Sequence, residues 1–161
     1  MLLLFVLANF VVAAVGARLG ERGPGTEVWF ASLRKPPGYP QDWIFAPLWT
    51  LVAIATGVAG WWIWRQSALT GDNSTLVLYG FLLLFNAAWQ GVALGLRRLG
   101  LALGVAWLLW ATINLTMALA SRGGMGWLWL LPYWLWVGYC LRLNHQLWHC
   151  NRDAPAGEQV C

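Results

Sequence analysis

The chain has 161 residues, of which 60% are hydrophobic and 10% are charged, and its formal net charge is +4. A soluble domain carries about 25% charged residues, so a surface this poor in charge favours lipid as the solvent and predicts an all-α membrane protein. At about 20 apolar residues per span, there is room for four to six transmembrane helices and for no separate soluble domain. The basic residues form no stripe, which argues against a nucleic-acid partner.

Five apolar segments, separated by short polar or Gly/Pro-rich connections, predict a five-transmembrane-helix bundle formed by one domain, residues 1–152. The expected helices cover residues 2–17, 43–64, 75–96, 100–121 and 127–148. The polar tail, residues 153–161, is expected to be disordered.

The first connection, residues 18–42, is long and aromatic. Long connections are usually functional or disordered, and aromatic content argues against disorder. Pro36, Pro37 and Pro40 exclude a regular helix around them. Two interpretations stay open. The segment is an aromatic belt at the membrane–water interface, or it is a lid that covers a pocket between helices and offers aromatic faces to a flat ligand.

Three amides, Asn86, Gln90 and Asn114, lie inside predicted spans. Each amide side chain would cost about 1–3 kcal/mol of free energy if it faced lipid without a hydrogen-bond partner. All three are therefore expected to face the bundle interior. There they either bond to other helices or line a pocket. Asn86 and Gln90 share a helix face with Trp89, which suits a large, mostly apolar ligand with a few polar groups.

Small residues recur at four-residue spacing at Ala87, Gly91 and Gly95. This spacing places them on one face, where another helix can approach closely. The face serves either packing within one chain or a homodimer interface.

The distribution of basic residues predicts the orientation in the membrane. Five spans bring the first connection, the turn after residue 96 and the C-terminal end to one side. Eight basic residues lie on that side: Arg18, Arg22, Arg34, Lys35, Arg97, Arg98, Arg142 and Arg152. Only Arg65 and Arg122 lie on the other side. The positive-inside rule then places the N-terminus outside and the aromatic loop and C-terminus in the cytoplasm.

Catalytic signatures are sparse. The six acidic residues fall in predicted loops or the tail, so no intramembrane proton relay is expected. His145 and His149 share a helix face beside Cys150 and could hold a metal or haem iron. No third ligand has suitable spacing, so we predict no metal site, and a polar helix end at the interface is the simpler interpretation.

Several motifs spread over nearly the whole chain resemble the TspO/MBR family of translocator and tryptophan-rich sensory proteins. The matching residues are Trp29, Leu33, Lys35-Pro36, Trp43, Phe45, Pro47, Trp49-Thr50, Asn86, Trp89, Pro132, Tyr133, Trp136, Leu143-Asn144, Trp148 and Asn151. The resemblance implies a five-helix bundle, usually a homodimer, that binds porphyrins such as protoporphyrin IX and haem as ligands and needs no obligatory cofactor. It further implies sterols and benzodiazepine-type or isoquinoline drugs as ligands, although His145 and His149 replace the tyrosine and arginine of the family's cholesterol motif.

The resemblance and the polar face together predict the ligand-binding residues. Trp29, Tyr39, Trp43 and Trp49 are expected to form the lid and wall. Asn86, Trp89, Trp136 and Asn144 are expected to line the cavity. The main hypothesis is a porphyrin-binding membrane protein that senses, sequesters or transports its ligand. One alternative is a light-dependent porphyrin-degrading enzyme, since Trp49 and Trp136 match the tryptophans implicated in that reaction. Another is a structural protein that acts through its dimer face.

Overall fold

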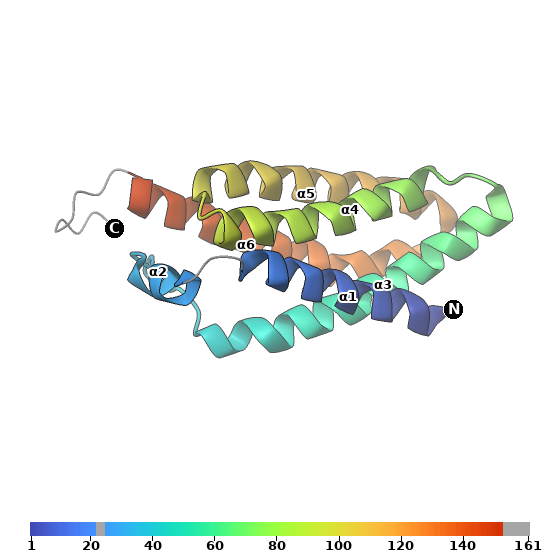
Figure 1. Ribbon diagram of the computed structural model, residues 1–161. Coiled ribbons are helices and arrows are strands. Elements are labelled where there is room, and N and C mark those ends of the chain that lie inside the picture. The colour runs from blue at the N-terminus through green and yellow to red at the C-terminus, as the bar shows by residue number, and fades with distance from the viewer. Residues whose placement is uncertain (22–24, 153–161) are drawn as a thin grey trace.

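The computed structural model describes residues 1–21 and 25–152, and this part of the chain contains helices and turns but no β-strand. Five long helices form an elongated bundle (Figure 1): α1 (Leu2–Gly20), α3 (Phe45–Thr70), α4 (Ser74–Gln90), α5 (Leu99–Ala120) and α6 (Leu131–Arg152). The short helix α2 (Thr26–Ser32) lies at one end. Short 3-10 or π segments adjoin the helices: η1 (Asp42–Ile44), η2 (Gly91–Gly95), η3 (Ser121–Gly123) and η4 (Met125–Leu130).

The all-α prediction is confirmed, and membrane crossing is supported for most of the bundle. Among the described residues, four helical segments are long and apolar enough to cross a membrane: Leu2–Gly20, Asp42–Thr70, Ser74–Gly95 and Leu99–Gly123. The predicted fifth span falls on α6, whose second half is polar, and it stays a prediction.

The helix boundaries differ from the predicted ones in several places, among them the end of α3, which continues to Thr70 rather than residue 64. Helix α1 continues to Gly20, because no strong helix breaker stands before the Gly/Pro segment after it. Residues 26–32, predicted as part of the lid loop, form α2, since the prolines restrict only the chain that follows. The last α-helix begins at Leu131 and is preceded by the 3-10 turn η4, where Gly126 lies so close to the Trp62 indole that a β-carbon would collide with it.

The predicted small-residue face packs inside the chain. Helix α4 ends at Gln90 and continues as the π segment η2. A β-carbon at Gly95 would collide with the carbonyl oxygen of Leu19, and one at Gly91 would lie 3.1 Å from the Leu19 β-carbon. Of the two interpretations that the sequence left open, intramolecular packing is therefore the one seen for Gly91 and Gly95. The homodimer, with Ala87 at its interface, stays a prediction.

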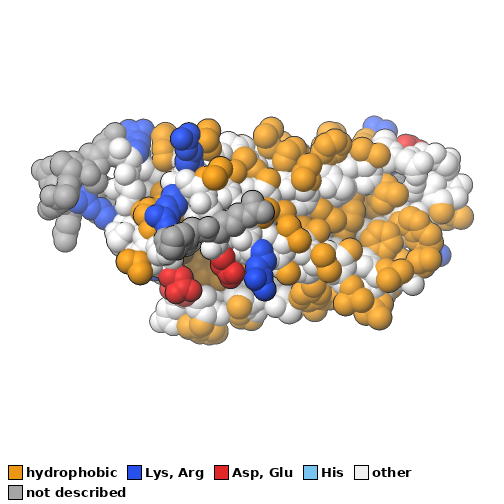
Figure 2. All heavy atoms as spheres, in the orientation of Figure 1, with side chains coloured by type: hydrophobic (Ala, Val, Ile, Leu, Met, Phe, Trp, Pro, Cys, Tyr) orange, Lys and Arg blue, Asp and Glu red, His pale blue; other side chains and the backbone are white. Residues whose placement is uncertain are grey.

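The surface of the bundle is apolar, as a lipid environment requires. Hydrophobic side chains cover most of the face in Figure 2, and Lys and Arg side chains gather near α2 and the C-terminal end of α6. Asn114 was expected to face the interior, and that prediction is wrong because its side chain is exposed. Its polar atoms are satisfied locally, since Nδ2 donates to the Trp110 carbonyl at 2.7 Å and Oδ1 accepts from Trp134 Nε1 at 3.1 Å.

Candidate ligand-binding cavity

A cavity of about 350 Å³ lies between α3, α4 and α6 at the end of the bundle where the first loop lies. Ligand sites for small molecules are typically of about this size, 300–1,000 Å³. The lining residues are Phe30, Tyr39, Asp42, Phe45, Trp49, Trp89, Gln90, Ala93, Leu94, Leu99, Cys140, Leu143, Asn144 and Leu147.

One aromatic wall of the cavity belongs to a cluster that continues into the core. The Trp49 and Trp89 ring centroids are 6.3 Å apart. Behind Trp49, the buried Trp136 packs edge-on against it with centroids 6.1 Å apart, and Trp136 also contacts Phe45 at 5.6 Å. Tyr39 continues the cluster onto the loop, 5.9 Å from Phe45. Since the rings support one another, the wall presents aromatic surface in a fixed orientation.

A chain of hydrogen bonds connects Trp89 of this wall to α6 and to the start of α5. Trp89 Nε1 donates to Asn144 Oδ1 at 3.0 Å, and Asn144 Nδ2 donates to the Leu99 carbonyl at 3.0 Å. These bonds link α4, the start of α5 and α6. Gln90 and Asp42 add further polar groups to an otherwise apolar lining. Such a cavity suits a large apolar ligand that carries a few polar groups.

The first loop closes over this end of the bundle and is held by specific contacts. Asn151 makes a reciprocal pair of bonds with the loop backbone: its Nδ2 donates to the Arg34 carbonyl at 3.1 Å, and its Oδ1 accepts from the Arg34 N–H at 3.0 Å. Lys35 Nζ lies 5.1 Å from the Tyr39 ring centroid and 3.8 Å from Asp42 Oδ2. Burial, with a smaller contribution from the Asp42 carboxylate, raises the pKa of Tyr39 to about 12.

Four of the eight predicted ligand-binding residues line the cavity: Tyr39, Trp49, Trp89 and Asn144. The other four lie elsewhere. Trp136 is buried one layer behind Trp49, and Asn86 lines a separate, smaller cavity. Trp29 packs under the Arg97 guanidinium, whose central carbon is 5.8 Å from the indole.

Trp43, predicted as part of the lid, is 69% exposed at the end of the bundle, and its Nε1 donates to Gln41 Oε1 at 2.6 Å. This position is typical of an interfacial aromatic side chain. Trp43 faces outward and Tyr39 faces the cavity, so the two residues differ in position, and both interpretations of the aromatic segment stay predictions.

Sequence reasoning missed most of the apolar lining, although helical periodicity carried a signal for it. Positions four residues from a predicted wall residue include Phe45 before Trp49, Ala93 after Trp89 and Cys140 before Asn144. These lie on the same helix faces as the wall residues. Phe30 had no such signal, because its place depends on how α2 folds over the bundle.

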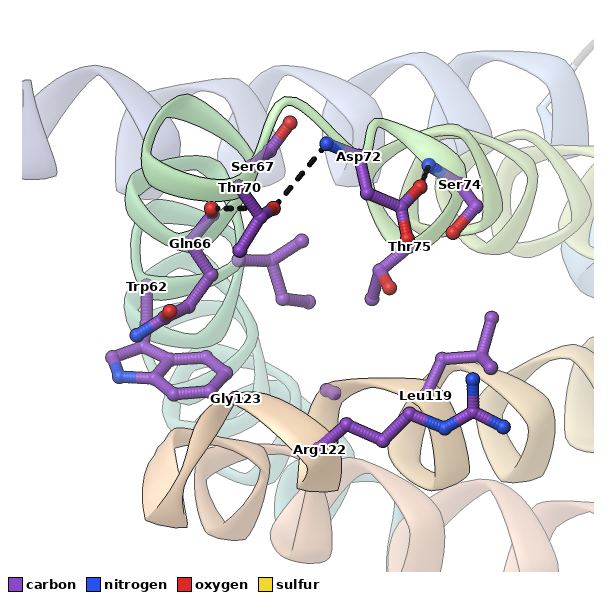
Figure 3. A pocket seen from close by; sticks show the side chains of 12 residues that line it. Trp62, Gln66, Ser67, Thr70, Asp72, Ser74, Thr75, Leu119, Arg122 and Gly123 are labelled. Carbon is purple, nitrogen blue, oxygen red and sulfur yellow. Dashed lines mark hydrogen bonds between the residues drawn. The ribbon is translucent and has the colours of Figure 1, made fainter.

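Two other hollows lie on the bundle outside this cavity. One of about 140 Å³ lies at the opposite end of the bundle (Figure 3), where Trp62 and Gln66 of α3 lie beside Gly123 of η3. Arg122 of η3 extends away from these two side chains, toward Leu119. The polar groups of this hollow already serve the turn that leads into α4, since Asp72 Oδ1 accepts from the Ser74 N–H at 2.8 Å. The other hollow, about 640 Å³, adjoins the main cavity and shares Phe30, Gln90 and Leu94 with it.

The histidine pair lies outside this lining. His145 and His149 are exposed on α6, and their ring centroids are 6.5 Å apart. Within the described part of the chain, no group of three or more His, Cys, Asp or Glu side chains could hold a metal ion. A role for the pair as haem-iron ligands has no geometric support from the cavity.

The apolar surface, the long apolar helices and a cavity between helices define an integral, multi-pass, all-α membrane protein. The sequence model of the TspO/MBR family matches residues 5–149, and the chain belongs to this family.

Relatives resemble this chain over most of their length. The translocator protein of Ovis aries is 31% identical over 167 residues, which cover 93% of this chain and 92% of the relative. The tryptophan-rich sensory protein of Cereibacter sphaeroides is 28% identical, with 95% and 92% covered. The tryptophan-rich protein TspO of Chlorobaculum tepidum is 31% identical, with 86% and 89% covered.

Proposed function

We propose that this protein binds porphyrins, such as protoporphyrin IX or haem, in the cavity between α3, α4 and α6. The observation that carries the proposal is the aromatic wall of Trp49 and Trp89 facing an apolar cavity with the few polar groups of Asn144, Gln90 and Asp42. A flat apolar macrocycle can stack on such a wall, and its polar substituents can reach the amides and the loop.

The relatives' names, translocator and sensory protein, suggest that binding serves transport or sensing. Either role requires a ligand that enters and leaves. The first loop supports this role, since it closes the cavity through a small number of hydrogen bonds that can open. Sterols and isoquinoline or benzodiazepine-type drugs share the apolar, ring-rich chemistry of this proposed ligand class, and the family resemblance favours them as further ligands.

The test is quenching of tryptophan fluorescence by protoporphyrin IX, titrated in detergent in the dark. Saturable quenching is expected. Trp49→Leu should weaken the affinity by up to about tenfold, because stacking on an aromatic side chain contributes about 0.5–1.5 kcal/mol. The matched control is Trp43→Leu, which removes an exposed indole outside the cavity and should leave the affinity unchanged. Non-saturable quenching, or equal effects of both variants, would contradict the proposal.

Contact between the Trp49 and Trp136 rings favours a second candidate, the light-dependent breakdown of bound porphyrin. In this scheme Trp49 meets the ligand, and Trp136 reaches it only through Trp49. The macrocycle would be oxidised with dioxygen as the consumed oxidant. Illumination of the complex in air should then bleach the porphyrin absorbance, and Trp136→Phe should slow the bleaching while leaving dark binding intact. Bleaching at the rate of free porphyrin would remove this candidate.

We further propose that α6 is the fifth membrane-spanning helix and that the protein forms a homodimer with its first loop and C-terminus in the cytoplasm. With 22 residues, α6 is about 33 Å long, which matches the hydrocarbon thickness. Its amide Asn144 is buried and bonded within the bundle, so it costs little in lipid. The basic residues gathered at the loop end favour the cytoplasmic side for that end.

A further inference from the structure

A second, much smaller cavity of about 20 Å³ lies in the middle of the bundle. It is separate from the ligand cavity but shares one lining residue with it, Trp49. Residues from α1, α3, α4 and α6 line it: Asn9, Ala13, Trp49, Val52, Ala53, Thr56, Asn86 and Tyr133. The α1 helix packs against α3 and α4, and α3 packs against α6.

Three polar atoms around this cavity have no hydrogen-bond partner among the described residues: Thr56 Oγ1, Asn86 Oδ1 and Tyr133 Oη. All three side chains are buried, with exposed fractions of 2%, 9% and 1%. Buried polar groups in folded proteins nearly always have a partner, and buried water often supplies it. Three such groups around one cavity therefore point to a shared partner.

We propose that these three side chains bind one ordered water molecule in the membrane-embedded core. The cavity has the right size, since one water needs about 10–15 Å³ by the same measure. The chemistry also matches. The water can donate to Asn86 Oδ1, accept from the Tyr133 hydroxyl, and use a remaining bond with the Thr56 hydroxyl, which gives it the usual two to four partners.

Neighbouring bonds show that this level of the bundle is polar beyond the cavity. Asn9 Nδ2 donates to Tyr79 Oη at 2.7 Å, and the Tyr79 hydroxyl donates to the Thr56 carbonyl at 3.2 Å. These bonds link α1, α3 and α4, and none of them involves α6. The water would join Tyr133 of α6 to the same polar layer, directly behind the Trp49 side of the ligand cavity.

The sign of a stability change distinguishes a water-filled cavity from a dry one. Thr56→Val and Tyr133→Phe keep the shape of the side chain and remove its hydroxyl. If the water is bound, each variant should lower the melting temperature by a few degrees, because the water loses a partner. If the cavity is dry, each variant removes an unsatisfied hydroxyl and should raise the melting temperature. Thr116→Val is the control, since Thr116 is equally buried but bonds only to the Thr112 carbonyl of its own helix.

A direct measurement does not depend on how well the variants fold. A high-resolution density map of the unaltered protein should show a solvent peak within hydrogen-bonding distance of Thr56, Asn86 and Tyr133. A map of that quality without a peak, or a rise in melting temperature for either hydroxyl variant relative to the unaltered protein, would overturn the proposal. Both readouts are independent of porphyrin binding, so the ordered water and the proposed function can fail separately.

Discussion

At the scale of single residues, the bond between Trp89 and Asn144 is the most informative contact in the ligand cavity. It joins two residues 55 positions apart in the chain, and each belongs to a different motif of the family. The indole N–H satisfies an amide oxygen that is otherwise buried in an apolar lining. The tryptophan thus serves both as aromatic surface and as a hydrogen-bond donor.

Trp89→Phe is therefore expected to lower stability by about 1 kcal/mol, because Asn144 Oδ1 loses its donor. Asn144→Leu should also destabilise the protein. The double variant should cost less than the sum of the two, since no unpaired group remains at this contact. Melting temperatures of the three variants measure this coupling, and strictly additive losses would show that the bond contributes nothing.

Tyr39 gives a pH-dependent prediction at the same scale. Because burial raises its pKa to about 12, the phenol stays protonated at pH values where an ordinary tyrosine, with a pKa near 10, has ionised. The raised pKa means that the folded state loses stability from pH 10 upward, as the unfolded state releases its proton first. The difference in phenolate absorbance between the unaltered protein and Tyr39→Phe should show one group that titrates near pH 12. A difference curve centred at pH 10 would contradict the half-buried position.

At the scale of helices and loops, Asn151 explains how a proline-rich segment gains a defined position. Pro36 and Pro37 have no N–H groups, so this loop cannot be ordered by a helix or a sheet. The side chain of Asn151 instead replaces a backbone partner, accepting from and donating to Arg34. A third bond, from Asn151 Nδ2 to the Leu147 carbonyl at 2.7 Å, fixes the amide on α6.

Asn151→Ala should release the loop without unfolding the bundle. Trypsin cleavage after Arg34 is expected to become faster, and bound porphyrin should dissociate more rapidly. The control is Asn73→Ala, which removes an asparagine from the turn at the opposite end and should leave both rates unchanged. Equal cleavage of the unaltered protein and Asn151→Ala would mean that the other contacts of the loop are enough to hold it.

At this scale, a sequence pattern encodes helices and shared helix faces, but not how deeply a side chain is buried. The long helices follow from apolar runs. Of the four predicted ligand residues that line the cavity, Trp49, Trp89 and Asn144 lie on helices, where spacing fixes which side chains share a face, and Tyr39 lies in the first loop. Asn86 and Trp136 share the polar or aromatic character of the lining, but they lie behind it. Their depth depends on how four helices pack together, and no local pattern encodes that. The exposed Asn114 was misplaced for another reason: a bond to its own helix satisfies it.

At the scale of the whole molecule, α6 decides the topology. Its second half is polar, so α6 is not among the described helices that are apolar enough throughout to cross a membrane, and its core-facing polar group is bonded within the bundle. Arg142 is exposed on this helix, and its long side chain can extend along the bundle to place its charge at the interface. A polar helix can cross the membrane in this way when its neighbours cover its polar groups.

Two epitope tags can show whether the number of membrane crossings between them is odd or even, and so whether α6 crosses. A short epitope tag inserted in the 71–73 turn is separated from a tag at the C-terminus by α4, α5 and α6. If all three helices cross, the two tags lie on opposite sides, and the excess of basic residues places the C-terminal tag in the cytoplasm. In sealed right-side-out vesicles, an antibody should then reach the turn tag but not the C-terminal tag.

Access to both tags, or to neither, would mean an even number of crossings and would exclude α6 as a span. A C-terminal tag that is accessible while the turn tag is protected would keep five spans but reverse the proposed orientation.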